Sequence, residues 1–233
     1  MMSTSGQEPG RQIQIESEDG ALGGYVAVPA TGQGPGVLVL QEWWGLVPQI
    51  RSVCDRLARA GFVALAPDLY RGESTADPDA AGRLMMELEI ERAGRDLGAA
   101  AEALRRQPET DGATIGCIGF CMGGQLALYG ACLRPEIGAV VDCYGVHPKV
   151  TLDLEHCRAR ILGIFAEHDE FIPASAVAEL ESALDRAGLS HTLLTYEGVQ
   201  HAFLNDARPD VFDADAAARA WRDIESFLKA ELR

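Results

Sequence analysis

The chain has 233 residues, of which 47% are hydrophobic and 24% are charged, as expected for a folded protein with a sizeable core and not for a disordered chain. Its formal net charge of −15 disfavours nucleic-acid binding, because an acidic surface repels phosphate. No run of residues has the length and apolarity of a membrane span or of a signal core. We therefore expect a cytoplasmic protein with neither nucleic acid nor membrane as a partner.

The N-terminal part of the chain predicts a tail and a hairpin. Residues 1–10 are small and polar and are expected to form a flexible tail, followed by a single domain over 11–233. Ile13 and Ile15 alternate with polar residues, as on a half-buried strand. A Gly-rich turn separates them from a second strand at about 22–28, which indicates an antiparallel pair.

Beyond this hairpin, strands and helices alternate along the chain. The predicted strands lie at 36–40, 62–66, 113–119, 137–143, 160–165 and 192–196. The predicted helices lie at 49–60, 122–133, 174–187 and 213–231, together with a helix-forming region at 78–107 that breaks near Gly94. This alternation predicts the α/β class, with a mostly parallel central sheet and helices on both of its faces.

The segment Gly119-Phe120-Cys121-Met122-Gly123 joins a predicted buried strand to a predicted helix. It has the glycine–nucleophile–glycine spacing of the strained strand-to-helix turn in α/β-hydrolases, where the glycines avoid Cβ clashes. Cys121 would stand at the N-terminus of the helix, where backbone N–H groups favour a thiolate and an oxyanion. The pattern predicts Cys121 as the nucleophile; the alternative is a buried cysteine packed between glycines.

A thiol nucleophile requires a base, and the base requires an orienting acid. In this fold the acid and then the histidine follow the nucleophile in chain order. Asp169 comes just after a predicted strand, with Glu167 and Glu170 as competitors. His201 lies in the loop before the last helix and is the predicted base.

We predict that the remaining cysteines pack in the core and take no part in catalysis. Apolar neighbours and the lack of a C-x-x-C pair favour reduced thiols. These cysteines are Cys54, Cys117, Cys132, Cys143 and Cys157. A metal site from His156, Cys157, His168 and Asp169 lacks a recognised ligand spacing, so neither a metal nor an organic cofactor is predicted.

Several segments, in this order, resemble those of the dienelactone hydrolase family, also called carboxymethylenebutenolidases. The resemblance extends from Gly36 almost to the C-terminus. The segments are Gln41-Glu42-Trp43-Trp44-Gly45, Pro67-Asp68-Leu69-Tyr70, Gly119-Phe120-Cys121-Met122-Gly123-Gly124, Asp169 with Ile172-Pro173, and His201-Ala202-Phe203.

The resemblance implies an α/β-hydrolase fold and a Cys-His-Asp triad made of Cys121, His201 and Asp169. It also implies that Glu42 lies beside the nucleophile and assists its deprotonation when substrate binds. A carboxylate there would oppose a permanent thiolate. The implied oxyanion hole consists of the backbone N–H groups of Trp43 and Met122.

The predicted contacts to substrate come from Trp44, Tyr144 and Arg83. The best-known family members bind a substrate carboxylate with arginines, one of them shortly after the catalytic histidine. In this chain no arginine follows His201 until Arg208.

These observations predict a cysteine-dependent hydrolase of a small-molecule ester or lactone, acting as a monomer or small homo-oligomer. A general carboxylesterase, thioesterase or peptidase on the same fold is the first alternative. A non-catalytic protein that uses Cys121 to sense redox state or to bind a ligand is the second.

Overall fold

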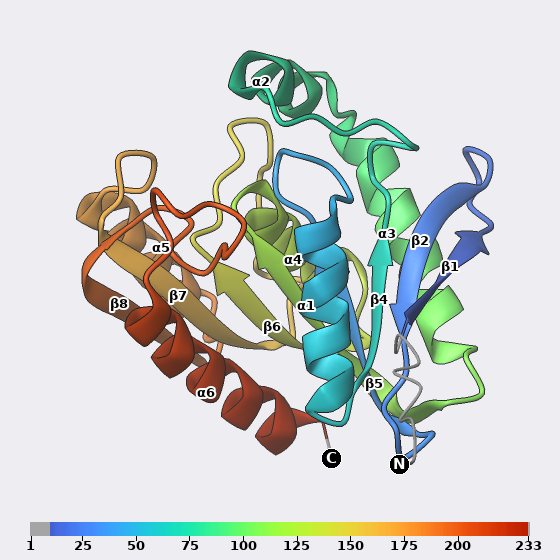
Figure 1. Cartoon of the computed structure of the whole chain (residues 1–233). Helices are drawn as coiled ribbons and strands as arrows, with labels where there is room; N and C mark the ends of the chain where they lie inside the picture. The colour runs from blue at the N-terminus through green and yellow to red at the C-terminus, as the bar shows by residue number, and fades with distance from the viewer. Residues whose placement is uncertain (1–9, 233) are drawn as a thin grey trace, which may run out of the picture.

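The computed structural model describes residues 10–232, and its centre is an eight-stranded sheet (Figure 1). The strands lie in the order β1-β2-β4-β3-β5-β6-β7-β8. The β1–β2 and β2–β4 pairs are antiparallel, and all the others are parallel. The bounds are β1 Gly10–Ile15, β2 Leu22–Ala27, β3 Gly34–Leu40, β4 Val63–Pro67, β5 Thr110–Phe120, β6 Ile137–Cys143, β7 Arg160–His168 and β8 His191–Gln200.

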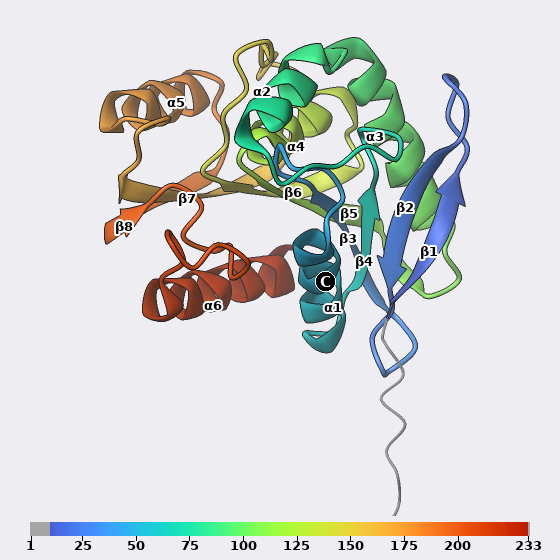
Figure 2. The ribbon, with the colours of Figure 1, turned by 45° about the horizontal axis from the view of Figure 1, so that its top comes forward.

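Helices cover both faces of this sheet, as the alternating pattern predicts. Their bounds are α1 Pro48–Arg59, α2 Pro78–Glu87, α3 Ile90–Arg105, α4 Met122–Leu133, α5 Ala174–Arg186 and α6 Ala214–Glu231. Figure 2 shows α1 and α6 on one face and α3, α4 and α5 on the other. Each face buries its own apolar cluster, with Leu57 and Trp221 in the first and Leu97 and Leu126 in the second. Such side chains each stabilise the fold by about 1.5–3 kcal/mol through burial.

Several predicted elements differ in their bounds from the structure, two of them most clearly. The region 78–107 breaks at Leu88, whose backbone is extended, and not at Gly94, which lies inside α3. A Cβ on Gly94 would come within 2.9 Å of Leu133 and 3.1 Å of Tyr129, so glycine there permits α3 to pack closely on α4. The strand predicted at 192–196 is the longer β8.

The predicted tail is only partly described. Gly10, the last residue assigned to it, begins β1, because it pairs with Ala27 of β2. The rest of the tail, residues 1–9, lies outside the described residues.

The parallel order brings distant parts of the sequence to one edge of the sheet. Glu42, Cys121, Asp169 and His201 follow within two residues the ends of β3, β5, β7 and β8, respectively. The carboxyl ends of parallel strands meet at a single edge, which is where open α/β sheets bind ligands. The fold therefore gathers the predicted site residues at this edge.

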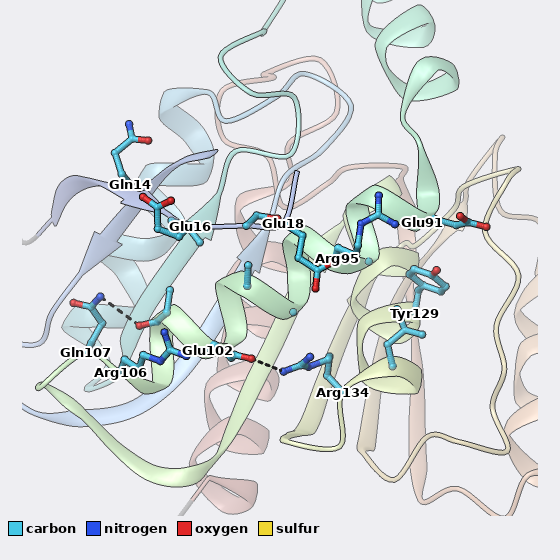
Figure 3. Close-up of a pocket in the computed structure, with 17 residues that line it drawn as sticks. Gln14, Glu16, Glu18, Glu91, Arg95, Glu102, Arg106, Gln107, Tyr129 and Arg134 are labelled. Atoms are coloured by element: carbon cyan, nitrogen blue, oxygen red, sulfur yellow. Dashed lines mark hydrogen bonds and ion pairs between the residues drawn. The ribbon is translucent and has the colours of Figure 1, made fainter. Parts of the chain in front are cut away.

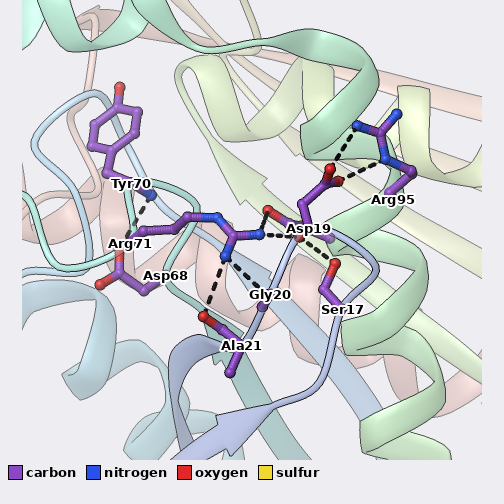
Figure 4. A network of polar contacts seen from close by, with 9 residues as sticks. Ser17, Asp19, Gly20, Ala21, Asp68, Tyr70, Arg71 and Arg95 are labelled. Atoms are coloured by element: carbon purple, nitrogen blue, oxygen red, sulfur yellow. Dashed lines mark hydrogen bonds and ion pairs between the residues drawn. The ribbon is translucent and has the colours of Figure 1, made fainter.

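Arg71, in the loop after β4, connects this loop to the β1–β2 hairpin and to α3 through hydrogen bonds (Figure 4). Its guanidinium donates to both carboxylate oxygens of Asp96, at 2.7 and 3.0 Å, and to the carbonyl oxygens of Gly20 and Ala21. Ser17 donates to the same carboxylate at 2.6 Å. Because Asp96 is only 1% exposed, it depends on these donors to compensate for its lost hydration.

Among the residues that the structure describes, no helix combines the length and the apolarity needed to cross a membrane.

Candidate active site

Cys121 lies on a strained turn between β5 and α4. Its φ of 52° and ψ of −123° are values that non-glycine residues rarely adopt. A Cβ on Gly119 would meet the carbonyl oxygen of Gly123 at 1.9 Å, and one on Gly123 would meet that of Gln41 at 2.5 Å. Both glycines of the motif are therefore required by close backbone contacts. The turn is held by the Cys121 N–H, which donates to the Cys143 carbonyl oxygen at 3.0 Å.

The surroundings of Cys121 favour a neutral resting thiol. The residue is 8% exposed, and burial raises the pKa of its thiol well above the ordinary value. The Glu42 carboxylate raises this pKa further, while the Met122 backbone N–H, which donates to the sulfur, lowers it. Burial and the nearby acid raise the pKa of the thiol more than the helix N-terminus lowers it. Forming a thiolate therefore needs a proton acceptor close by.

His201 and Asp169 form a direct pair. His201 Nδ1 lies 2.7 Å from Asp169 Oδ2, and the Asp169 side chain is fully buried. The other oxygen, Oδ1, accepts the backbone N–H groups of Phe171 at 2.8 Å and Ile172 at 2.9 Å. These amides fix the carboxylate and leave Oδ2 directed at the imidazole.

The two competing acids are placed differently. Glu167 accepts the Gly198 N–H at 2.8 Å, and Glu170 is exposed. Of the three acids in this segment, Asp169 is the one that hydrogen-bonds to His201.

Glu42 is a buried acid with a specific partner. Asn205 Nδ2 donates to Glu42 Oε2 at 2.9 Å, and the two residues are 2% and 3% exposed. The other oxygen, Oε1, has no hydrogen-bond partner among the described residues. Burial raises the pKa of Glu42, and the Asn205 hydrogen bond opposes part of that rise. Glu42 is therefore a carboxyl group that can take up a proton more readily than an exposed glutamate.

Cys121, His201 and Glu42 line one cavity of about 220 Å³. Trp43 and Trp44, whose rings meet edge to face with centroids 4.9 Å apart, form part of its wall. The full lining is Glu42, Trp43, Trp44, Pro78, Met85, Cys121, Val146, Phe171, His201, Ala202 and Arg208. A small, mostly apolar space beside a strained cysteine and a histidine can hold the carbonyl group of a small molecule.

Two residues predicted to bind substrate do not line this cavity. Arg83 is exposed on α2. Tyr144 is completely buried, and its ring packs edge-on against His201 with centroids 5.0 Å apart. Tyr144, directly after β6, has a positive φ of 43°, and its buried ring packs on His201 without lining the cavity.

Sequence reasoning did not predict several residues of the cavity wall, among them Arg208 and Phe171. The Arg208 guanidinium lies 5.9 Å from the Trp44 ring centroid and pairs with Asp210 at 2.7 Å. The Phe171 ring meets the His201 ring edge to face at 5.0 Å. Arg208 is the first arginine after His201, but its distance in sequence gave no sign that the loop returns to the site.

The remaining cysteines and histidines lie in other settings. All six cysteines are free and buried, so the structure contains no disulfide. His156 pairs with Asp153 and His168 with Glu167, both at the surface. Within residues 10–232, no group of three or more His, Cys, Asp and Glu side chains could hold a metal ion.

A larger and more open groove of about 860 Å³ lies between β1 and helices α3 and α4 (Figure 3). Its arginines already pair with acids: Arg95 with Asp19, and Arg106 and Arg134 with Glu102. It shares no lining residue with the cavity at Cys121. The strained turn and the His201–Asp169 pair therefore lie at the smaller cavity and not at this groove.

The mostly parallel sheet, the helices on both faces and the strained turn at the end of β5 define an α/β-hydrolase. The family model for the dienelactone hydrolase family matches residues 22–232. The chain belongs to this family, and it is a hydrolase enzyme.

Known proteins agree with this assignment. The chain is 36% identical to the protein usf of Aquifex pyrophilus over 230 residues, which cover 96% of this chain and 99% of that one. It is also 36% identical to a candidate carboxymethylenebutenolidase of Aquifex aeolicus over 231 residues, covering 96% and 100% of the two chains. A candidate dienelactone hydrolase of Klebsiella pneumoniae superposes with a TM-score of 0.85 at 27% identity, covering 94% of this chain and 98% of that one.

Proposed function

We propose that the chain hydrolyses small esters or lactones through a Cys121-His201-Asp169 triad. The observation that carries this proposal is the 2.7 Å hydrogen bond between His201 Nδ1 and Asp169 Oδ2, made by a histidine that lines the same cavity as Cys121. An imidazole whose Nδ1–H donates to a carboxylate exposes Nε2 as a proton acceptor. The strained turn supports the choice of nucleophile, because strain at a single residue is typical of reacting positions.

The proposed reaction has two halves. The Cys121 thiol loses its proton to His201, either directly or by way of Glu42, and the sulfur attacks the carbonyl carbon. The backbone N–H groups of Trp43 and Met122 stabilise the oxyanion. The protonated His201 then gives its proton to the leaving oxygen, and an acyl thioester remains on the cysteine.

In the second half, His201 takes a proton from a water molecule, and the resulting hydroxide attacks the thioester. The carboxylic acid product leaves, and the proton returns to the sulfur. Asp169 orients the imidazole and stabilises its charged form throughout. The high pKa that burial gives the thiol limits its reactivity between turnovers, because only the thiolate is a strong nucleophile.

The cavity wall bears on the substrate class. It is apolar apart from Glu42, His201 and the cation of Arg208. In a chain of net charge −15 an anionic substrate gains nothing from the overall field, so a local cation must receive a carboxylate. Arg208 supplies such a cation, and its partner Asp210 is an exposed ion that a substrate carboxylate can replace at small cost.

The test is a panel containing a dienelactone and p-nitrophenyl acetate, measured with wild type, Cys121→Ala and Arg208→Gln. We expect Cys121→Ala to abolish turnover of every substrate. Arg208→Gln should raise KM for the anionic dienelactone and leave p-nitrophenyl acetate almost unchanged. Turnover of simple esters alone, still dependent on Cys121, would indicate a general carboxylesterase. Near-normal activity of Cys121→Ala would disprove the proposed nucleophile.

A further inference from the structure

A second cavity of about 170 Å³ lies next to the one that contains Cys121. Val146 and Phe171 line both cavities, so these two side chains form a shared wall. The backbone N–H of Val146 donates to the carbonyl oxygen of Cys121 at 3.2 Å, which fixes this wall directly to the nucleophile's turn.

The second cavity is lined mainly by apolar side chains. Gln125 and Asp142 are the charged or amide side chains in its wall. The full lining is Gln125, Leu128, Asp142, Gly145, Val146, Leu152, Phe165, Phe171, Ile172, Ala176, Val177 and Leu180, from α4, β6, β7, α5 and the loops between them. A space of this kind receives a hydrocarbon group better than a charged one.

The sizes of the two cavities argue that they serve one ligand. Ligand pockets start at roughly 300 Å³, a volume that neither cavity reaches alone but that the two exceed together. Phe171 is 59% exposed although it stands between two apolar spaces, so a ligand in either space would cover it. Its ring meets the His201 ring edge to face, with centroids 5.0 Å apart.

The position of Phe171 also indicates which part of the substrate enters the second cavity. In the proposed reaction His201 protonates the leaving oxygen, so this oxygen must lie beside the imidazole. The group attached to that oxygen then continues past a side chain that packs on His201. Tyr144 and Phe171 both pack on His201, but Tyr144 is buried outside the cavity, whereas Phe171 lines it and also lines the second cavity.

We propose that the second cavity binds the apolar alcohol part of an ester substrate. The proposal rests on the proposed function, and it goes further by assigning a leaving-group subsite to residues of α4 and α5. The enzyme should therefore select esters by the length of their alcohol, while the acyl part stays in the space beside Trp43 and Trp44.

The experiment compares two series of esters by pH-stat: acetates of methanol, ethanol, propanol and butanol, and methyl esters of acids of matching length. For wild type we expect kcat/KM to rise along the alcohol series by up to about fourfold per methylene, the gain from burying one CH₂ group. The acyl series should show no comparable rise.

A matched pair of variants on α5 assigns the effect to the cavity. Ala176 lines the second cavity, whereas Ala178, two residues along the same helix, is exposed and does not. Ala176→Phe should abolish the rise along the alcohol series, because the larger side chain fills the second cavity. Ala178→Phe should behave as wild type. If Ala176→Phe does not fold, Leu152→Ala provides the opposite change, since a larger cavity should extend the rise to longer alcohols.

Failure of this inference can be separated from failure of the proposed function. If Cys121-dependent hydrolysis occurs without a rise along the alcohol series, or if Ala176→Phe alters the acyl series instead, the subsite assignment is wrong and the triad stands. If turnover does not depend on Cys121, the proposed function is wrong, and the subsite assignment is wrong with it.

Discussion

The substitution Asp169→Asn tests the histidine–carboxylate pair without removing a side chain. The carboxylate serves two backbone N–H groups with Oδ1 and His201 with Oδ2. Asparagine has a single acceptor oxygen, which would accept the two backbone N–H groups that now donate at 2.8 and 2.9 Å. The amide NH₂ then faces His201 Nδ1, which must become an acceptor, so its proton moves to Nε2. An imidazole in that tautomer cannot take the proton of Cys121.

The expected loss of activity is large because the substitution changes the tautomer of His201 and removes the charge of Asp169 at the same time. We expect kcat/KM to fall by on the order of 10³–10⁴, approaching the loss of about 10⁴ in kcat that this substitution causes in a serine-protease triad. That corresponds to about 4–5.5 kcal/mol of transition-state stabilisation. The assay is p-nitrophenyl acetate hydrolysis between pH 6 and 9, with circular dichroism to verify the fold. A folded variant within about tenfold of wild type would refute the reasoning.

Glu167→Gln is the matched control. Glu167 lies two residues away on the same segment, but its contacts are the exposed His168 and the Gly198 N–H, which a glutamine oxygen can also accept. We expect a change of no more than about twofold, as for surface substitutions in general. An equal loss in both variants would mean that the loop geometry matters and not the pair with His201.

Three further predictions concern buried charges. Glu42→Gln removes the carboxylate that raises the pKa of the Cys121 thiol, so the rate of iodoacetamide alkylation should rise at a lower pH than in wild type, and an unshifted profile would contradict this. Arg71→Met leaves Asp96 buried without its cation and should cost about 3–5 kcal/mol in urea unfolding; a loss below about 1 kcal/mol would mean that water compensates. Burial raises the pKa of Asp142 from 3.8 to about 7, so the folded state binds this proton more tightly than the unfolded state. This group's contribution to stability therefore falls as pH rises through that window, and the stability of Asp142→Asn relative to wild type should be greater at pH 8 than at pH 5 in urea titrations.

Much of the architecture could be predicted because the local signals agree with the fold. Continuous apolar runs predicted the buried parallel strands, and the glycines at 119 and 123 predicted the turn whose backbone contacts exclude a Cβ. The order of Cys121, Asp169 and His201 in the chain predicted that they would meet, because each follows a parallel strand.

What sequence reasoning missed depends on contacts between segments. Gly94 signalled a helix break, but its small size serves the packing of α3 on α4, and the break falls at Leu88, where no glycine or proline marks it. Arg208 and Phe171 reach the cavity only because their loops fold back over the carboxyl edge of the sheet. Neither position has a spacing that reveals this return.

The proposed mechanism requires a covalent acyl group on Cys121 during turnover. Rapid-quench mass spectrometry tests this requirement most directly. Enzyme mixed with p-nitrophenyl acetate would be quenched in acid within the first turnovers and digested, with Cys157→Ala treated in parallel because a hydrogen bond from Cys132 lowers the pKa of that thiol. We predict one acetyl group on the peptide that contains Cys121 in both proteins, formed and lost at rates compatible with turnover. An acetyl group on another residue, or p-nitrophenol release without any acetylated Cys121, would contradict the account.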